Sequence, residues 1–409
     1  TTGLLNTKGL RLALENHKIN NAICFFFDIY RFSSIRDYYG FSLGDLILKH
    51  VADLLKSLVP DALIARYSGD QFVVIATNKS REEEEKFLDS LEKNLNPYFV
   101  SDKTTIQLTI KLGYSRYPFD TEDIYQLIPL ASLAVQDIDE SDGKLVKKYE
   151  PKMYQLFTKN IEMSIRLREA ILNETIEVYF QKIYNTQTNN VSFIEALARW
   201  HDTKYGPIPP NHFFEIATQS GIIISLEEYL INKALDTYLE LNKDDEYQNT
   251  KVAININPAT LLRDDVVDFF VNTCNEKNIN PQDVCVEISE KTFVHNLDIC
   301  TKHIKALKKC GFLIALDDFG KDYSSLSILS NIDFDIIKID GTFVNNITDP
   351  KNKAIIEMIM TISKISQKEI IAECVENHLE SKILLDMNCA IQQGYYFHVP
   401  EKLGNKKNE

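Results

Sequence analysis

The sequence lacks the features of a membrane-spanning or secreted protein. Its uninterrupted apolar runs, such as AICFFF and GIII, stay far below the roughly eighteen residues that a membrane-spanning helix needs. No charged segment followed by an apolar stretch and a cleavage site opens the chain. We therefore expect this portion to be soluble.

The chain also lacks the usual cysteine and histidine metal motifs, and it lacks positive charge. Its 7 cysteines form no CxxC pair, and its 8 histidines show no HxxxH spacing. Cys24, Cys285, Cys374 and Cys389 lie inside apolar runs, so we expect buried free thiols in a reducing cytoplasm. The net charge of −14 argues against nucleic acid or an anionic membrane as a partner, so an anionic substrate would need bound cations and local arginines.

What the sequence does contain is a series of short apolar runs after residue 190, each ending in a carboxylate or an amide. The runs are FIEALARW, VAININP, VCVEISE, FLIALDDFG, IIKID, IIAECVE and AIQQGYYF. Helix-length amphipathic segments separate them, which is typical of parallel strands in a (β/α)8 barrel, where strand ends meet on one face. The alternative is that these polar residues only mark the beginning of loops. That would account for any single run, but it accounts less well for seven consecutive runs. The polar residues expected on that face are Glu195, Asn255, Glu287, Asp317, Asp318, Lys338, Glu373 and Gln393.

Five of these residues suit hard divalent cations. Glu195, Asn255, Glu287 and Asp317 offer only oxygen ligands, and Asp318 adds another carboxylate, which favours Mg²⁺ or Mn²⁺ over zinc or copper. The carboxylates would repel one another without cations. Two ions sharing the Asp317/Asp318 edge would lower the pKa of a water molecule and stabilise the charge on a phosphodiester. The pattern predicts metal-assisted hydrolysis.

Two cationic residues fit the same face. Lys338 ends its own strand, where its ammonium could hold the nucleophilic water or neutralise negative charge; the alternative is a solvated lysine at a loop start. Arg199 follows Leu197 and Glu195 in strand alternation, so the three share a face, and its guanidinium could grip a phosphate through two hydrogen bonds.

Together these motifs resemble, in order, those of the EAL family of cyclic di-GMP phosphodiesterases, from about residue 163 to 403. They are Glu195-Ala-Leu-Ala-Arg199-Trp200, Asn255, Glu287-Ile-Ser-Glu290, Asp317-Asp318-Phe-Gly320, Lys338-Ile-Asp340, Glu373-Cys-Val-Glu376 and Gln393-Gly-Tyr. The resemblance implies a TIM-like barrel, two Mg²⁺ or Mn²⁺ ions, hydrolysis of cyclic di-GMP to linear pGpG, and a homodimer. It also implies that Lys338 and Asp318 act in catalysis with Glu373 as the general base. The implied substrate contacts are Gln181, Leu197, Arg199 and Gln393, and Glu290 anchors a loop.

The first third of the chain alternates strands and helices, which predicts a compact α/β sandwich. It resembles a GGDEF domain, the diguanylate cyclase module, over residues 1–150. The motifs are Thr2-Gly-Leu-Leu-Asn6, Phe27-Asp28-Ile, Gly44-Asp45 and Arg66-Tyr-Ser-Gly-Asp-Gln-Phe72. We expect a nucleotide-cyclase-like sandwich, a helical linker over residues 151–162, and the barrel over residues 163–405.

The first module departs from its family at the cyclase signature, which reads Ser68-Gly69-Asp70-Gln71-Phe72. A serine replaces the first glycine, a neutral glutamine replaces the acidic fourth residue, and Arg36 stands where the family has a guanine-reading asparagine. Asp28, Asp45 and Asp70 are kept. We expect no cyclase activity; the module either retains GTP as a regulatory ligand or is a spacer or dimerisation module that binds no nucleotide.

The barrel departs from its family at two places. Lys321 and Asp322 replace a small residue and a glycine in the loop after Gly320, and Cys374 replaces a glycine beside Glu373. An altered loop raises the alternative of a receptor that binds cyclic di-GMP without turnover, and a pure interaction scaffold is a third possibility. The complete set of metal and water-positioning residues favours the enzyme. Because the chain begins inside the family's opening motif, we expect a cytoplasmic protein that is a part of a longer, possibly membrane-attached chain.

Overall fold

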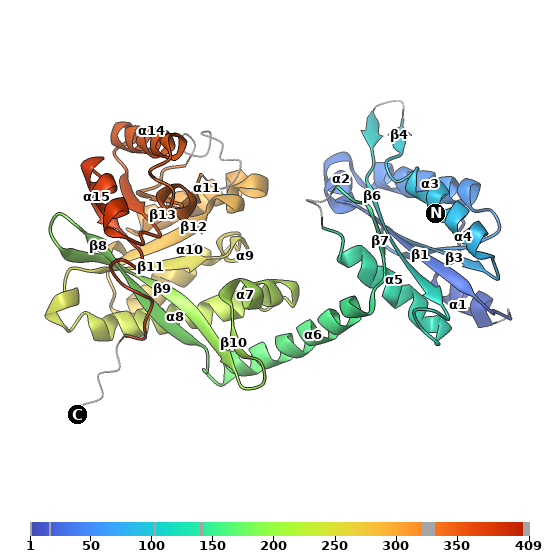
Figure 1. Cartoon of the computed structure of the whole chain (residues 1–409), viewed down its shortest axis with the longest axis horizontal. Coiled ribbons are helices and arrows are strands. Elements are labelled where there is room, and N and C mark those ends of the chain that lie inside the picture. The colour runs from blue at the N-terminus through green and yellow to red at the C-terminus, as the bar shows by residue number, and fades with distance from the viewer. Residues whose placement is uncertain (1, 16–17, 102–103, 140–142, 321–331, 404–409) are drawn as a thin grey trace. The chain divides into compact units, whose positions relative to one another are not determined.

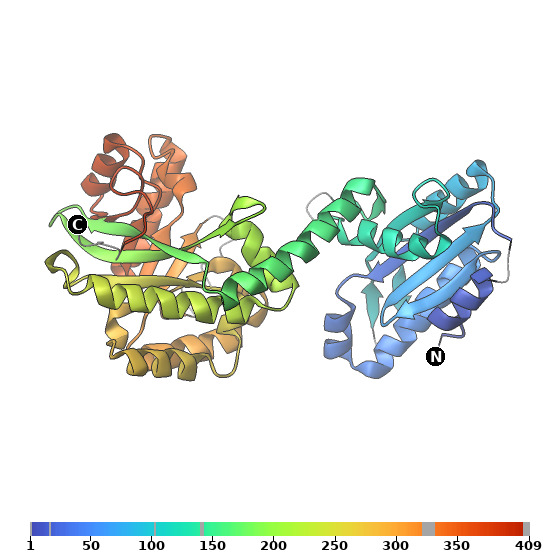
Figure 2. The same ribbon diagram turned by 90° about the horizontal axis from the view of Figure 1, so that it is seen from below.

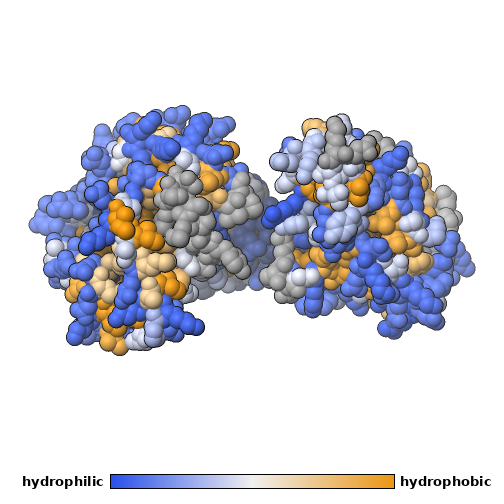
Figure 3. Space-filling view, turned by 90° about the horizontal axis from the view of Figure 1, so that it is seen from above, coloured by the Kyte–Doolittle hydropathy of each residue, from blue (hydrophilic) through white to orange (hydrophobic). Residues whose placement is uncertain are grey.

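The computed structural model describes residues 2–15, 18–101, 104–139, 143–320 and 332–403. The chain forms two compact units, Thr1–Glu162 and Met163–Glu409 (Figure 1). Hydrophilic residues cover most of the surface of each unit in the view of Figure 3, with apolar residues in scattered patches. Among the described residues, no helix is both long and apolar enough to cross a membrane.

The first unit is built on a five-stranded sheet with the order β2-β3-β1-β6-β7. The strands are β1 (Ala22–Ile29), β2 (Leu63–Ser68), β3 (Gln71–Thr77), β6 (Ile110–Tyr117) and β7 (Val146–Lys148). Only the β6–β7 pair is parallel. A separate hairpin consists of β4 (Tyr98–Val100) and β5 (Thr105–Gln107).

Helices cover both faces of this sheet because β1 is apolar on both sides. Phe25 and Phe27 enter one core with residues of α3 (Phe41–Leu58) and α4 (Arg81–Glu92). Cys24 and Phe26 enter a second core with residues of α1 (Thr7–Glu15) and α5 (Leu127–Gln136). The short helix α2 (Phe32–Tyr39) precedes α3. The predicted α/β sandwich is confirmed.

The second unit is a closed barrel of eight strands. Its order is β9-β11-β12-β13-β14-β15-β16-β8, and β8 also pairs with β9, which closes the ring. The strands are β8 (Glu177–Asn185), β9 (Asn190–Asp202), β11 (Lys251–Ile256), β12 (Val284–Ser289), β13 (Leu313–Phe319), β14 (Ile336–Ile339), β15 (Glu369–Ala372) and β16 (Ile391–Gln392). A further strand, β10 (Gly206–Ile208), pairs with β9 outside the ring. The predicted TIM-like barrel is confirmed.

The barrel differs from a regular (β/α)8 barrel at its first strand. β8 runs antiparallel to both β9 and β16, whereas the other neighbouring strands of the ring are parallel. The reason is the short connection: Asn185 pairs with Asn190 across the turn, and parallel strands need a crossover of a dozen or more residues. The expectation of parallel strands concerned the seven runs after residue 190, whose strands do pair in parallel, and β8 lies before them. The polar run from Asn185 to Asn190 could have indicated this hairpin.

Helices lie outside the barrel strands (Figures 1 and 2). They are α7 (Pro210–Gln219), α8 (Ile223–Leu241), α9 (Pro258–Leu261), α10 (Val266–Lys277), α11 (Phe293–Lys309), α13 (Gly341–Val344), α14 (Pro350–Ser366) and α15 (His378–Asp386). The expected linker belongs to one continuous helix, α6 (Pro151–Leu172), whose Met163, Leu167 and Ala170 are buried in the barrel unit.

An apolar layer inside the barrel supports the polar face above it. Each of the eight ring strands contributes one residue to this layer: Ile183, Phe193, Ala253, Cys285, Ala315, Ile336, Ile371 and Ile391. Side chains of a strand alternate between its two faces, so the next inward position is two residues away along each strand. On the parallel strands that position lies nearer the carboxyl end.

Candidate active site

A layer of polar residues follows the apolar layer on every strand of the ring. Each member is two residues from the apolar residue of its own strand, in the direction of the carboxyl ends of the parallel strands. The members are Gln181, Glu195, Asn255, Glu287, Asp317, Lys338, Glu373 and Gln393. Strand alternation alone thus brings residues from distant parts of the sequence to one end of the barrel.

Lys338 lies at the centre of this layer. Its Nζ atom is 2.8 Å from Glu373 Oε1, 2.9 Å from Glu287 Oε1, 3.3 Å from Asp317 Oδ1 and 3.5 Å from Glu195 Oε2. The Lys338 side chain is fully buried. The prediction that its ammonium faces the carboxylates agrees with these distances, whereas a solvated lysine at a loop start does not.

The cluster carries more negative than positive charge. With all four carboxyl groups ionised, the cluster around the one ammonium carries a formal charge of −3 in a largely buried site. Burial alone would lower the pKa of Lys338, but its four carboxylate neighbours outweigh burial and raise that pKa well above its ordinary value. Burial raises the pKa of Glu287 well above its ordinary value, and it raises the pKa of Glu373 to about 8. A cluster of this kind is stabilised by protons or by added cations.

Amide side chains fix the orientation of Glu195. Gln393 Nε2 donates to Glu195 Oε2 at 2.6 Å and to Gln181 Oε1 at 3.1 Å, and Asn255 Nδ2 donates to Glu195 Oε1 at 2.6 Å. Burial would raise the pKa of Glu195, but Lys338 and these two amides lower it below its ordinary value. Glu195 is therefore held as a carboxylate, and the Oδ1 atom of Asn255 is left for another partner.

Asp317 and Asp318 lie at an irregularity of β13. The register of β13 with β14 shifts between Leu316 and Phe319, and Asp318 has a left-handed backbone with φ 54°. Consecutive residues of a regular strand point to opposite faces, and a bulge changes that direction. The bulge is the local structure that would allow both carboxylates to serve one site. The sequence did not indicate it.

The residues of this layer fit divalent cations. Glu287 Oε2 is buried and accepts no hydrogen bond, whereas Glu287 Oε1 and Asp317 Oδ1 pair with the Lys338 ammonium at 2.9 and 3.3 Å. Such oxygens, together with a negative formal charge, are what Mg²⁺ and Mn²⁺ require. In the described part of the chain, no three acidic, histidine or cysteine side chains converge closely enough to hold an ion as they stand, because Lys338 Nζ takes the place between them. The two-metal assignment stays a prediction.

Three of the expected substrate residues, Gln181, Leu197 and Arg199, lie on β8 and β9, and the fourth, Gln393, follows β16. Leu197 pairs with Tyr179, and the guanidinium of Arg199 lies over the Tyr179 ring at 5.6 Å. Arg199 Nη1 donates to the carbonyl of Ala198 at 2.9 Å. Glu290 is buried at the end of β12, as an anchor would be. Lys321 and Asp322, the altered loop positions, lie outside the described residues.

The expectation of a buried thiol is wrong for Cys374. This residue follows the end of β15 and is exposed, with a left-handed backbone at φ 54°. A glycine adopts that conformation without strain, which explains why a glycine suits the position. A Cβ on Gly341 would lie 2.5 Å from Cys374 Cβ and 2.6 Å from its Sγ, so the thiol side chain rests against Gly341.

Sequence analysis did not identify Glu227, a buried carboxyl group close to this site. Ile223, Leu226, Leu230 and Ile231 form the buried face of α8, and Glu227 lies among them at 3% exposure. A carboxylate at an apolar position of a helical pattern is the signal that could have revealed it.

The first unit brings three of its predicted residues together. Asp28 of β1 pairs with Gln71 of β3, and Gln71 Nε2 donates to Asp28 Oδ2 at 3.0 Å. Burial raises the pKa of the neighbouring Asp70, with a further contribution from the charge of Asp28. Asp45 lies on α3 and is exposed. The Arg36 guanidinium stacks over the exposed ring of Phe41 at 5.1 Å.

A TIM-like barrel with a buried acidic cluster at the carboxyl ends of its strands belongs to the class of barrel proteins whose site is built from strand ends. The sequence profile of the EAL domain matches residues 165–400, which is more than half of the chain, so the chain belongs to the EAL domain family. The profile described as diguanylate cyclase, GGDEF domain, matches residues 2–144.

Three curated relatives match both units. The chain is 29% identical over 385 residues to the signaling protein YkoW of Bacillus subtilis, covering 93% of this chain and 48% of YkoW. It is 26% identical over 409 residues to the cyclic di-GMP phosphodiesterase NbdA of Pseudomonas aeruginosa, covering 98% and 52%. It is 28% identical over 407 residues to the cyclic di-GMP phosphodiesterase PdeR of Escherichia coli, covering 98% and 61%. The chain thus spans about half to three-fifths of the length of these relatives.

Solved structures share the barrel fold. The phosphodiesterase PaMucR in complex with c-di-GMP matches with a TM-score of 0.56 and 25% identity, covering 59% of this chain and 98% of that one. The EAL enzyme Bd1971 bound to cAMP and cyclic di-GMP matches with a TM-score of 0.59 and 23% identity, covering 75% and 90%. At that identity the second likeness shows the fold alone.

Proposed function

We propose that the barrel hydrolyses cyclic di-GMP to linear pGpG in the cytoplasm, with two Mg²⁺ or Mn²⁺ ions bound among its carboxylates. The observation that carries this proposal is the buried cluster around Lys338, with a formal charge of −3. A merely structural cluster would be costly to bury, because unpaired buried charge destabilises a fold. Membership of the EAL domain family and the phosphodiesterase names of NbdA and PdeR support the proposal.

Glu195, Asn255, Glu287 and Asp317 would hold the two cations, with Asp318 at the bulge of β13. The ions would neutralise the charge of the phosphodiester and lower the pKa of a water molecule. The hydrogen bonds from Gln393 and Asn255 keep Glu195 ionised and oriented for that role. Arg199 lies four residues beyond Glu195 on β9, where its guanidinium would bind a phosphate oxygen.

Glu373 would take the proton from the attacking water. Burial raises its pKa to about 8, so it is a stronger base than an exposed glutamate. Lys338 holds the Glu373 carboxylate at 2.8 Å and keeps its orientation. The water oxygen forms a new bond to phosphorus, and the bond from phosphorus to one ribose 3′ oxygen breaks. One such cleavage opens the ring and yields pGpG.

A receptor that binds cyclic di-GMP without turnover is the second candidate function. The altered Lys321–Asp322 positions favour it, because they depart from the family's motif directly after Gly320. The buried cluster favours the enzyme, since a receptor needs phosphate and guanine contacts but no set of under-neutralised carboxylates. Hydrolysis under saturating metal distinguishes the two.

For the first unit we propose a regulatory or dimerisation role without cyclase activity. Gln71 supplies a neutral amide where the family has an acid, and it already occupies one oxygen of Asp28. The Arg36 side chain stands at the family's guanine-reading position. GTP remains a candidate regulatory ligand of this unit, and a homodimer remains the expected assembly.

The test is incubation of the protein with cyclic di-GMP and either Mg²⁺ or Mn²⁺, followed by chromatographic separation of the nucleotides. The enzyme hypothesis predicts metal-dependent pGpG, and it predicts none with a chelator or with Ca²⁺, whose looser coordination misplaces the water. Asp317→Asn is the matched variant, because it removes one charge and changes the shape little. Binding of cyclic di-GMP without any product would instead establish the receptor.

A further inference from the structure

Helix α8 places one carboxyl group on the face that packs against the barrel. Glu227 is 3% exposed and uses both of its oxygens. Oε1 accepts a hydrogen bond from the backbone N–H of Asn257 at 2.6 Å, and Oε2 accepts one from the hydroxyl of Thr260, which is fully buried. The remaining residues of this helix face are apolar.

Both partners of Glu227 belong to the turn that follows β11. Asn257 is the N-cap of α9, and its own side chain accepts from the N–H of Ala259. Asn255, an expected metal ligand, lies two residues before Asn257. Its side chain reaches Glu195 at 2.6 Å. Glu227 is therefore connected to the acidic cluster through the turn, Asn255 and Glu195.

Strand pairing holds this end of β11 on one side only. The ladder of β11 with β9 ends at Ile254, whereas the ladder with β12 continues to Ile256. Asn255 lies beyond the last paired residue on the β9 side. Fewer strand-pairing hydrogen bonds therefore hold the backbone here. The hydrogen bond from Asn257 N–H to Glu227, which lies outside the barrel, adds a further constraint.

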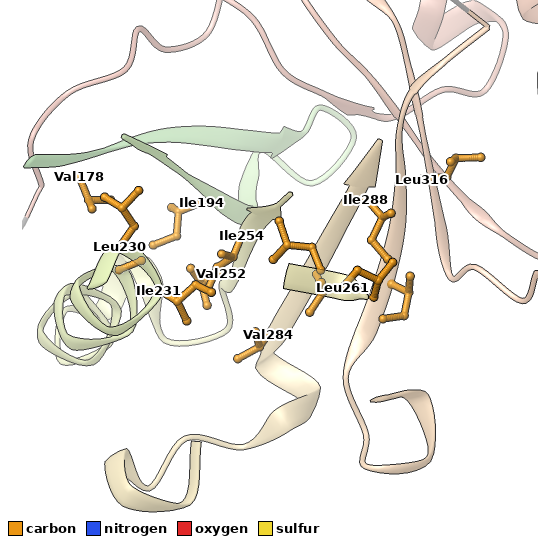
Figure 4. Packing of buried hydrophobic residues seen from close by; sticks show 14 of the residues in the cluster. Val178, Ile194, Leu230, Ile231, Val252, Ile254, Leu261, Val284, Ile288 and Leu316 are labelled. Carbon is orange, nitrogen blue, oxygen red and sulfur yellow. The ribbon is translucent and has the colours of Figure 1, made fainter. Parts of the chain in front are cut away.

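A small cavity lies beside Glu227 and Asn255. It measures about 40 Å³ and is lined by these two residues and by apolar side chains of β8, β9, α7 and α8. Leu230 and Ile231 of α8 lie near Val252 and Ile254 of β11 in Figure 4. Asn255 is itself exposed, so packing does little to hold its side chain.

We propose that Glu227 is a positioning residue that fixes Asn255, and through it Glu195, in the orientation needed for metal binding. This inference rests on the proposed function of the barrel. Residues that orient metal ligands from outside the coordination sphere typically change metal affinity by about 10- to 100-fold when they are removed. An apolar residue at this place would pack equally well but would leave Asn257 N–H and the Thr260 hydroxyl without a partner.

The decisive variants are Glu227→Leu, Glu227→Gln and Leu230→Ala. Leucine removes both hydrogen bonds, whereas glutamine can accept from Asn257 N–H and donate to the Thr260 hydroxyl. Leu230→Ala is the matched control, because it disturbs the same helix and the same cavity without touching the turn. Calorimetric titration of the full chain with MnCl₂ gives the dissociation constant, and steady-state hydrolysis at saturating Mn²⁺ separates kcat from KM.

Glu227→Leu is expected to weaken Mn²⁺ binding by about 10- to 100-fold and to lower kcat more than it raises KM. Glu227→Gln should stay within about threefold of the wild type, and Leu230→Ala should lose thermal stability while keeping its Mn²⁺ affinity. A folded Glu227→Leu protein with wild-type Mn²⁺ affinity and kcat overturns the inference. If that variant does not fold, Thr260→Val decides: weakening of at least about threefold supports the inference, and unchanged affinity overturns it. Absence of Mn²⁺ binding by the wild type would instead contradict the proposed function itself.

Discussion

The two units of this chain each bring carboxylates to the end of a sheet, but only one of them leaves those carboxylates under-neutralised. In the barrel, Lys338 is the ammonium among four carboxyl groups, of which Glu195 and Glu287 are buried and Asp317 and Glu373 are partly exposed. In the first unit, the amide of Gln71 donates to Asp28 and carries no charge. The two sites therefore differ in how their negative charge is balanced, not in whether acidic residues are present.

In the hairpin of the first unit, the neutral amide of Gln71 stands where the GGDEF family has an acid. Replacing one acid by an amide of nearly the same shape preserves the fold of the hairpin, since Asp28 and Gln71 still pair in register. The amide provides a hydrogen-bond donor where a metal would meet a second carboxylate.

The largest expected effect separates the two sites directly. Glu195→Ala or Asp317→Ala should reduce hydrolysis of cyclic di-GMP by at least about 100-fold, because each removes an expected metal ligand. Both residues lie near strand ends, so circular dichroism should show a folded barrel. Asp28→Ala, measured without GTP, should change the rate by less than about twofold. A wild-type rate in either barrel variant would contradict the metal assignment.

The pH dependence of hydrolysis tests whether Glu373 of the barrel site acts as the base. Glu373 must be deprotonated to accept a proton, and its pKa is about 8 in the absence of metal, so activity should rise with pH through that range. Added cations favour the carboxylate and lower the pKa. Raising Mn²⁺ from subsaturating to saturating levels should therefore move the acid limb of kcat/KM to lower pH by about one unit or more. A limb that stays fixed would exclude Glu373 as the titrating base.

The contact between Cys374, the residue after Glu373, and Gly341 should affect the stability of the barrel. Gly341→Ala should destabilise the barrel by about 1–3 kcal/mol, because its Cβ would meet the Cys374 side chain at 2.5 Å. Cys374→Gly should be neutral or stabilising by up to about 1 kcal/mol, because it relieves a left-handed backbone. The double variant should recover most of the Gly341→Ala loss in urea unfolding. Additive effects would mean that the two side chains do not meet.

Charge imbalance should also be visible without catalysis. In the chelated protein near pH 8, Glu287→Gln should raise the free energy of unfolding by about 1 kcal/mol or more, since Glu287 Oε2 is buried without a hydrogen bond and one ammonium faces four carboxyl groups. Saturating Mn²⁺ should reverse the order and favour the wild type. Differential scanning calorimetry with and without metal measures both. An unchanged Tm in chelator would contradict the excess negative charge.

The smallest effect concerns the first unit. Gln71→Glu would place a carboxylate opposite Asp28, and like charges in register should cost roughly 0.5–1 kcal/mol. Mg²⁺ should restore that stability in thermal unfolding. The variant should still make no cyclic di-GMP from GTP, because Arg36 and Ser68 remain. Synthesis by the unaltered chain would overturn the inactive assignment.

Much of the barrel site could be predicted because it follows from strand alternation. The runs ending at Glu195, Glu287 and Lys338 each showed an apolar strand with a polar residue at its inward end, and the ring closes as those runs predict. Local sequence could not reveal the bulge at Asp317–Asp318, because it depends on pairing with β14. The central position of Lys338 likewise depends on carboxyl groups from four other strands or strand ends, which come together only in the closed barrel.

Two further features, the β8–β9 hairpin and the buried Glu227, left a signal in the sequence that was not used. The antiparallel β8–β9 hairpin was signalled by the short polar connection from Asn185 to Asn190, which is too short for a crossover helix. Glu227 was signalled by its place on an apolar helix face, although its partners at Asn257 and Thr260 are set by tertiary packing. Cys374 was misjudged because apolar neighbours in sequence do not reveal a left-handed turn at a strand end.

The central claim is that the buried carboxylates of the barrel need divalent cations to act on cyclic di-GMP. The most direct measurement is a time course of cyclic di-GMP in chelated protein, followed by addition of Mn²⁺ and chromatographic separation of products. The account predicts no turnover before the addition and stoichiometric pGpG after it, with Asp317→Asn inactive throughout. Turnover in the chelated protein, or none after Mn²⁺ is added to folded wild type, would contradict it.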